Sequence, residues 1–171
     1  MKTAVLVFHP DINQSRVNSA LANGIESLSN VNVRYVYSLY PDGKIDVMAE
    51  QAALENTDRI VLQFPMQWYS PPPLLKQWLD EVLTYGWAYG SEGNALLGKE
   101  LMLAVSLGGP ESAYQADGEI GHTVGEYLLS FESIAKYTGM SYITPFITGG
   151  SMNISDTDID AQVARYRTLL A

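Results

Sequence analysis

The sequence contains no cysteine among its 171 residues. This absence excludes a disulfide scaffold, a thiolate metal site, a cysteine nucleophile and an iron–sulfur cluster. Basic residues are also scarce: 10 Lys and Arg face 19 Asp and Glu, which gives a net charge of −9. A chain this acidic is poorly suited to hold a phosphate backbone or an anionic membrane surface by charge, so we expect no nucleic-acid partner.

Long apolar runs are missing as well. Stretches such as residues 4–8 and 101–105 fall far below the roughly 20 residues of a membrane-spanning helix, and the N-terminal run is too short for a secretory signal peptide. We therefore expect a cytoplasmic protein. The chain also has no glycine-rich dinucleotide motif, no Walker loop and no G-x-S-x-G motif. Its only histidines, His9 and His122, have no second ligand at metal-binding spacing, and we expect no bound metal.

Segments typical of strands and of helices alternate along the chain. Short apolar runs predict strands, and apolar residues at three- and four-residue spacing predict amphipathic helices. The expected strands span residues 3–8, 31–37, 59–64, 101–107 and 141–146, and the expected helices span residues 17–28, 48–56, 74–83, 124–135 and 159–170. These alternations predict one α/β domain over residues 1–171, with a doubly wound, five-stranded parallel sheet covered by helices on both faces.

In such a sheet a ligand binds at the carboxyl ends of the strands, so the loops after the first, third and fourth expected strands are of most interest. The first loop, residues 9–18, leads into a helix N-terminus, where free amides and a partial positive charge favour a phosphate. Ser15 adds a hydroxyl, Arg16 a cation and His9 a ring donor. The alternative is a plain turn at His9 with Ser15 as a helix cap.

The second loop, residues 64–73, is rich in proline and contains an adjacent Trp68–Tyr69 pair. A stiff loop would hold these rings as walls for a planar ligand, and its backbone amides would serve the ligand's edge. We expect the loop to be extended, so that the two rings point in opposite directions. The alternative is that Trp68 packs beneath the loop.

The third loop, residues 106–114, contains Gly108-Gly109, which permits a ligand to approach the backbone closely. An ordinary turn is the alternative. A second pair, Gly149-Gly150, follows the fifth expected strand, and no neighbouring residue indicates a chemistry for it. The acidic stretch 156–160 lacks the Gly and Glu of a calcium loop and predicts the start of a helix.

Several stretches together carry a family resemblance. They are His9-Pro10 with Ser15 and Asn18, Tyr40-Pro-Asp42 with Ile45-Asp46, Glu50-Gln51 with Leu54, Pro65-Met-Gln-Trp-Tyr69, Pro72 to Trp78 with Asp80, Gly86-Trp-Ala-Tyr-Gly90, and Gly108-Gly109 with Glu111-Ser112. In this order they resemble the flavodoxin-like NAD(P)H:quinone oxidoreductases, and within them the ancillary reductases of glutathione-gated potassium-efflux systems. The resemblance implies a flavodoxin-like fold with strand order 2-1-3-4-5.

The resemblance also implies a flavin, with FMN favoured over FAD because the C-terminal extension of long FAD-binding relatives is lacking. NAD(P)H is the implied co-substrate. The implied cofactor-binding residues are His9, Ser15, Arg16, Val17 and Asn18 around the phosphate and ribityl chain, Met66, Gln67, Trp68 and Tyr69 at the isoalloxazine ring, and Ser106, Leu107, Gly108 and Gly109 at its pyrimidine side.

The sequence departs from the family pattern at two places. Ser106-Leu107 stands where the family often has two threonines, which removes one hydroxyl contact. Tyr114 matches a tyrosine that assists hydride transfer in larger relatives, but Ile120 stands at the matching histidine position and His122 lies two residues further on. Tyr114 and His122 are therefore the catalytic candidates, and a solvent-facing His122 is the alternative.

The implied activity is the transfer of two electrons, by hydride transfer through FMN, from NAD(P)H to a quinone or similar electrophile. The resemblance implies a homodimer with the site near the subunit boundary, and Trp78, Trp87, Tyr85 and Tyr89 are compatible with such an interface. Three alternatives stay open: a regulatory subunit docked on a potassium-efflux membrane protein, a flavodoxin-type electron carrier, and a family member that has lost its cofactor.

Overall fold

Parallel strands form the centre of the computed structural model, which describes residues 1–171. The strands are β1 (Thr3–Val7), β2 (Val31–Tyr35), β3 (Arg59–Pro65), β4 (Glu100–Ser106), β5 (Ser141–Tyr142) and β6 (Phe146–Thr148). Their order is β2-β1-β3-β4-β5, with β6 also paired to β4, and every pairing is parallel. The predicted fold class and strand order are confirmed.

The last position in the sheet differs from the prediction of one continuous strand over residues 141–146. β5 ends at Tyr142 and β6 begins at Phe146, so that prediction is wrong. The three residues between these strands span only two residues of β4, because Leu101 pairs with Tyr142 and Ala104 with Phe146. Pro145 explains the interruption, since it has no amide to donate and restricts the residue before it.

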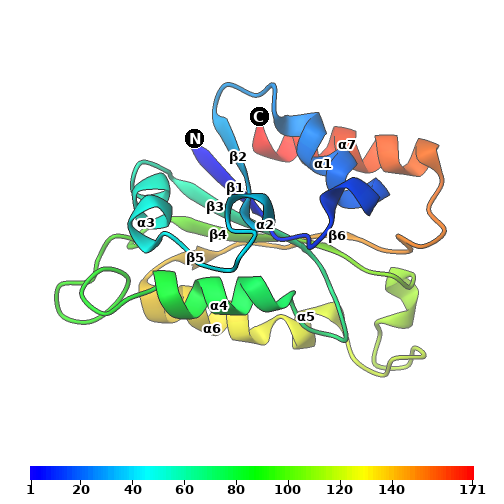
Figure 1. Ribbon diagram of the computed structural model, residues 1–171. Helices are drawn as coiled ribbons and strands as arrows, with labels where there is room; N and C mark the ends of the chain where they lie inside the picture. Colours follow the sequence, from blue (N-terminus) through cyan, green and yellow to red (C-terminus); the bar gives the residue numbers. More distant parts are fainter.

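Helices cover both faces of the sheet (Figure 1). They are α1 (Arg16–Ile25), α2 (Val36–Leu39), α3 (Val47–Glu55), α4 (Pro73–Val82), α5 (Val124–Tyr127), α6 (Leu129–Thr138) and α7 (Asp156–Leu170), with 3₁₀ turns η1 (Ile12–Gln14) and η2 (Glu111–Ala113). The strand expected over 31–37 ends at Tyr35, where α2 follows directly. The helix expected over 124–135 is two helices, because Leu128 has a ψ of 2°.

The core has two layers because side chains alternate along the buried strands. Ala4, Leu6 and Phe8 pack with buried residues of α2, α3, α4 and α6. Val5 and Val7 point the other way and pack with α1 and α7. α1 and α7 lie side by side on that face of the sheet (Figure 1).

A buried carboxylate of α3 joins β2, the segment after α2, and α4. Glu50 of α3 has no exposed surface, and its Oε1 accepts hydrogen bonds from the Arg34 guanidinium and the Tyr40 hydroxyl, the latter at 2.7 Å. Its Oε2 accepts from Trp78 Nε1 at 2.9 Å. Trp78 is therefore a core residue, only 2% exposed, and the expectation that it serves a subunit interface is wrong.

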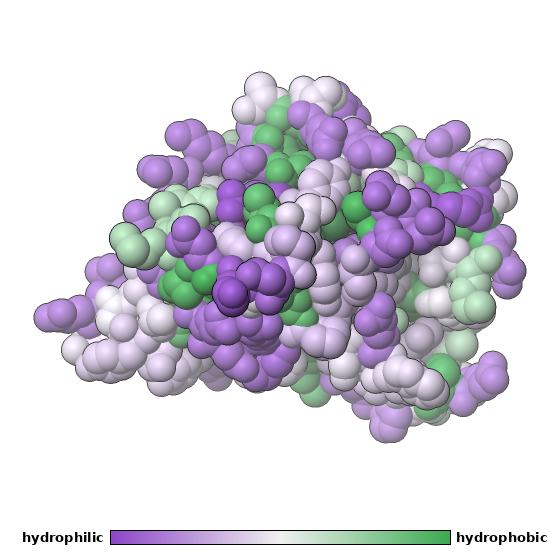
Figure 2. All heavy atoms as spheres, in the orientation of Figure 1, coloured by the Kyte–Doolittle hydropathy of each residue, from purple (hydrophilic) through white to green (hydrophobic).

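The surface is mixed in character. On the face of Figure 1, hydrophilic residues predominate and hydrophobic ones form separate patches (Figure 2). None of the helices combines the length and the apolar character required to cross a membrane.

Candidate functional site

The carboxyl ends of β1, β3, β4 and β6 meet at one edge of the sheet. Pro65 of β3 pairs with Ser106 of β4, and Ser106 pairs with Thr148 of β6. The three predicted ligand loops and the Gly149-Gly150 segment therefore all start within one neighbourhood.

A cavity of about 250 Å³ lies at this edge, at the N-terminus of α1. It is lined by His9, Gln14, Ser15, Arg16, Val17, Asn18, Pro65, Ser106, Ser151 and Met152. The structure thus brings together all five residues predicted from the first loop and Ser106 from the third. It does not place Met66, Gln67, Trp68, Tyr69, Leu107, Gly108 or Gly109 in the wall of this cavity.

Ser15 is positioned as the N-cap of α1. Its Oγ accepts hydrogen bonds from the Asn18 amide at 3.0 Å and from Asn18 Nδ2 at 3.3 Å. Asn18 Nδ2 also donates to Ser106 Oγ at 2.9 Å, while Gln63 Nε2 donates to the Asn18 carbonyl at 2.9 Å. Because both serine oxygens accept from Asn18, their hydroxyl protons are left to donate elsewhere.

Arg16 lies at the rim of the cavity and is paired within the protein. Its guanidinium donates to the Ile154 carbonyl at 3.1 Å and to Asp156 Oδ1 at 2.5 Å. Asp156 begins α7, which Ser155 caps, so the predicted acidic helix start is confirmed. The cavity therefore presents mostly neutral donors, with the charge of Arg16 partly balanced.

His9 follows β1 and is held by its neighbour. Its Nδ1 accepts a hydrogen bond from the Asp11 amide at 3.2 Å, so the neutral ring carries its proton on Nε2. Burial lowers the pKa of His9 from its usual value, against the opposing effects of Asp11. His9 is thus suited to donate a hydrogen bond as a neutral ring rather than to supply a charge.

The second loop folds into a tight turn instead of the expected extended segment. Gln67 and Ser70 exchange backbone hydrogen bonds of 2.8 and 3.0 Å. The two residues between them, Trp68 and Tyr69, have φ values of 47° and 62°. Two positive φ angles are typical of a type I′ turn, which normally requires glycine or asparagine. Aromatic residues in this conformation are strained.

The two aromatic rings of this turn lie in different surroundings. Trp68 is 93% exposed, so the alternative that it packs beneath the loop is wrong. Tyr69 stacks on Tyr127, with ring centroids 5.0 Å apart and an interplanar angle of 23°. The amides of Trp68 and Tyr69 donate to no other group of the protein, so they are available to a ligand.

The third loop lies beside the cavity. Leu107 is fully buried, and its amide donates to the Thr148 carbonyl at 2.9 Å. By contrast, the amides of Gly108 and Gly109 donate to no other protein group. Both glycines line a groove of about 640 Å³ that adjoins the cavity through Met152, which borders both.

The Gly149-Gly150 pair, for which the sequence suggests no chemistry, shapes this region. The Gly150 amide donates to the Gly109 carbonyl at 2.7 Å, and the Ser151 amide donates to the Leu107 carbonyl at 2.9 Å. A Cβ on Gly149 would lie 2.7 Å from the Glu111 amide nitrogen. The pair therefore brings Ser151 and its neighbour Met152 against the third loop.

The catalytic candidates both contact Tyr127. Tyr114 is 8% exposed, and its ring meets Tyr127 edge-on at 6.3 Å. Burial, followed by Tyr69 and Tyr127, raises the pKa of Tyr114, which keeps its hydroxyl a neutral donor. His122 is exposed, lies 3.5 Å from Glu126 Oε1, and meets Tyr127 edge-on at 5.9 Å.

Sequence reasoning missed five residues of this region. Gln14, Pro65, Ser151 and Met152 line the cavity, and Tyr127 touches both catalytic candidates. Gln14 and Pro65 lie within the first and second loops that the sequence singles out, and the glycine pair before Ser151 was a further signal, since paired glycines permit close backbone approach. Tyr127 had no such signal, because its spacing with Phe131 fits a core helix.

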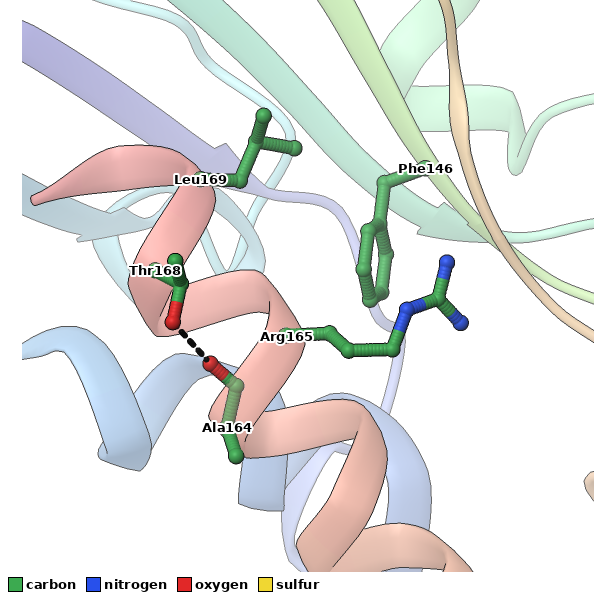
Figure 3. Close-up of a pocket in the computed structure, with 5 residues that line it drawn as sticks. All are labelled: Phe146, Ala164, Arg165, Thr168 and Leu169. Atoms are coloured by element: carbon green, nitrogen blue, oxygen red, sulfur yellow. Dashed lines mark hydrogen bonds between the residues drawn. The ribbon is translucent and has the colours of Figure 1, made fainter.

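Another hollow, of about 570 Å³, lies between α7 and β6 (Figure 3). The Arg165 guanidinium carbon lies 5.3 Å from the centroid of the Phe146 ring. The lining residues Phe146, Ala164, Arg165, Thr168 and Leu169 include none of the predicted site residues. No group of three or more histidine or acidic side chains could hold a metal ion.

Comparisons with known proteins identify the family to which this fold belongs. The model of the family described as having a flavodoxin-like fold matches residues 1–170. The chain is 46% identical over 165 residues to an uncharacterised NAD(P)H oxidoreductase of Bacillus subtilis (strain 168), covering 96% of this chain and 95% of that protein. It is 44% identical over 168 residues to a glutathione-regulated potassium-efflux system ancillary protein of Klebsiella aerogenes, covering 97% and 93%.

Two solved structures extend the comparison. The general stress protein 14 of Treponema denticola, in complex with FMN, superposes with a TM-score of 0.94 at 44% identity, covering 99% of this chain and 98% of that chain. An NADPH-quinone reductase of P. pentosaceus superposes with a TM-score of 0.91 at 33% identity, covering 100% and 98%.

Proposed function

The chain belongs to the flavodoxin-like family, and from this membership we propose that it is an FMN-dependent NAD(P)H oxidoreductase that reduces quinone-like acceptors. One observation carries the proposal. The cavity at the N-terminus of α1 gathers neutral donors suited to a phosphate, and it opens beside two glycines with free amides. The FMN complex of one relative and the quinone reductase activity named for another support this assignment.

The residues present fit the parts of FMN. Ser15, Ser106 and His9 each offer a donor toward the cavity, where the phosphate and ribityl hydroxyls would lie. The N-terminus of α1 adds amides and a partial positive charge. The free amides of the Trp68–Tyr69 turn and of Gly108-Gly109 suit the carbonyl oxygens and ring nitrogens of the isoalloxazine.

FMN, when bound, supplies the hydride and electron transfer. The chain's own residues bind and orient the reactants. Trp68 offers an exposed aromatic face beside the place where the isoalloxazine ring would lie. Tyr114 keeps its hydroxyl proton because burial raises its pKa, so it acts as a fixed donor to the substrate. His122, on the exposed side, provides a second donor at the entrance.

The test compares FMN with riboflavin, which lacks the phosphate. We expect the protein to bind FMN more tightly than riboflavin and to oxidise NADPH only when a quinone such as menadione is present. Ser15→Ala should reduce affinity for FMN roughly 10- to 150-fold, as expected for the loss of one hydrogen bond to a charged group, and leave affinity for riboflavin unchanged. Ser29→Ala, an exposed serine outside the cavity, is the matched control.

The outcomes separate the alternatives. No flavin binding would refute the proposal and favour a protein that has lost its cofactor. FMN binding without quinone-dependent NADPH oxidation would favour an electron carrier. An equal loss of affinity for FMN and for riboflavin in Ser15→Ala would show that this cavity does not hold the phosphate.

A regulatory role is the second candidate, favoured by the 44% identity to a potassium-efflux ancillary protein. In this role the same chain docks on a membrane protein while retaining its flavin site. The measurement is potassium efflux from vesicles that contain a glutathione-regulated efflux protein, with and without this chain. Unchanged efflux at saturating concentrations of the chain would exclude this role.

We also propose that two copies of the chain associate. Tyr85, in the segment between α4 and β4, is 71% exposed, and exposed aromatic residues of this kind are enriched in interfaces. Light scattering should give twice the 18.8 kDa chain mass, and Tyr85→Ser should shift the equilibrium toward the monomer. A monomeric wild-type protein at micromolar concentration would contradict this.

A further inference from the structure

We propose that Tyr127 is a positioning residue that fixes the flavin-facing turn and both catalytic candidates against one ring; this inference rests on the proposed function. Tyr127 is the last residue of α5 and is half-buried. Its ring contacts aromatic side chains from three separate segments: Tyr69, Tyr114 and His122. No other ring in the structure joins these segments.

The first contact acts on the strained turn. Tyr69 has a φ of 62° and Trp68 a φ of 47°, a conformation that the sequence alone disfavours. Trp68 is almost fully exposed and contributes no packing that would hold the turn. The stack of Tyr69 on Tyr127, at 5.0 Å and 23°, is therefore the aromatic contact that holds the turn in place.

The other two contacts of the Tyr127 ring are edge-on. Tyr114 and His122 meet Tyr127 at interplanar angles of 85° and 78°, the T-shaped arrangement favoured by the charge distribution of aromatic rings. Tyr114 follows η2, whereas His122 precedes α5. A backbone hydrogen bond from the Ile120 amide to the Ala113 carbonyl, at 3.0 Å, joins their two segments, and Tyr127 is the side chain that contacts both rings.

α5 itself is fixed by a capping box. The Thr123 amide donates to Glu126 Oε2 at 2.7 Å, and the Glu126 amide donates to Thr123 Oγ1 at 3.3 Å. Next to Tyr127, Leu128 is 2% exposed and anchors the junction with α6 in the core. The backbone that carries the Tyr127 ring is thereby fixed at both ends of α5, which suits the ring to orient the side chains that pack against it.

The test uses the two flavins again, because Tyr127 acts at the ring end of the site and not at the phosphate. Tyr127→Ala should raise the dissociation constants of FMN and riboflavin by the same factor, about 3- to 10-fold. It should also lower kcat for quinone reduction at saturating FMN. Tyr127→Phe, which keeps the ring and removes only the hydroxyl, should remain within about twofold of wild type in both measurements.

Two further variants control for folding. Tyr127→Leu keeps apolar volume without a ring, and should behave like Tyr127→Ala in both measurements while remaining fully folded in the absence of urea. Tyr137→Ala removes a 72% exposed ring of α6 that contacts Tyr89, outside this cluster, and should leave flavin binding unchanged.

The inference and the proposed function fail in different ways. If wild type binds no flavin, the proposed function fails. If wild type binds both flavins and Tyr127→Leu binds them equally well with unchanged kcat, the function stands and the role of Tyr127 is refuted. A Tyr127→Phe variant as impaired as Tyr127→Ala would also refute it, because the stacking ring would then not be the active feature.

Discussion

The strained turn between Gln67 and Ser70 yields a quantitative prediction. A non-glycine residue in the left-handed region costs about 1–2 kcal/mol, and Trp68 occupies that region at a φ of 47°. Asparagine tolerates this conformation far better. Because Trp68 is 93% exposed, its replacement forfeits almost no burial. Trp68→Asn should therefore raise the free energy of unfolding of the flavin-free protein by about 1 kcal/mol.

Tyr69→Asn is the matched control. It relieves a similar strain at a φ of 62°, but it also removes the stack on Tyr127, and an aromatic pair contributes about 0.5–1.5 kcal/mol. The two effects oppose each other, so the net change should be close to zero. The difference in stability between the two variants then measures the packing of the Tyr69 ring, including its stack on Tyr127.

The assay is urea unfolding of the flavin-free variants, supported by thermal melts. A gain of 1 kcal/mol corresponds to a rise of about 2–4 °C in a domain of this size. At the same time Trp68→Asn should weaken FMN binding, because the exposed aromatic face is lost. An unchanged or lowered stability, or an equal gain in Tyr69→Asn, would refute the reasoning that strain is held here for function.

Three further predictions concern ionisable and buried groups. Burial lowers the pKa of His9 below its usual 6.5, so the unfolded chain binds a proton at this position more readily than the folded protein does. The contribution of the neutral His9 ring to the free energy of unfolding is complete above pH 6.5 and decreases as the pH falls from about 6.5 toward the lowered pKa. His9→Asn should flatten this part of the stability profile measured in urea. Glu50→Gln leaves the Arg34 guanidinium without its carboxylate and should lower the free energy of unfolding by about 3 kcal/mol in urea. Tyr166 is fully buried and its hydroxyl has no protein partner, so Tyr166→Phe should raise the melting temperature, equivalent to about 1 kcal/mol.

Each of these has a clear contrary result. An unchanged acid limb in His9→Asn would show that another group controls it. A Glu50→Gln protein as stable as wild type would show that the buried pair is dispensable, and a destabilised Tyr166→Phe would show that its hydroxyl is satisfied.

Much of the fold could be predicted because its buried strands are continuous apolar runs. β1, β3 and β4 follow directly from such runs, and each is nearly fully buried. The split of the last strand at Pro145 was also visible in principle, since proline cannot donate to a ladder. The break at Leu128 was not, because its side chain fits the apolar face of a continuous helix while only its backbone departs.

The candidate site also has a part that the sequence predicts and a part that it does not. The cavity residues around Ser15 were predictable because a helix N-terminus after a buried strand is a recurrent anion site. The turn at Trp68 was not, because local preference opposes it: aromatic residues favour extended backbone, and tertiary contacts with Tyr127 prevail. Such conflicts between local preference and final structure are expected at functional sites.

The cavity joins the first loop of the chain to its last. Arg16 and Asp156, which meet at its rim, are 140 positions apart, and Ser151 lines the cavity from the segment that follows β6. Contacts so distant in sequence form late in folding, since their loop-closure entropy must be offset by earlier structure. A ligand that contacts both the first and the last loop therefore cannot bind before these loops have come together. Binding of such a ligand would report that a newly synthesised chain has completed its fold.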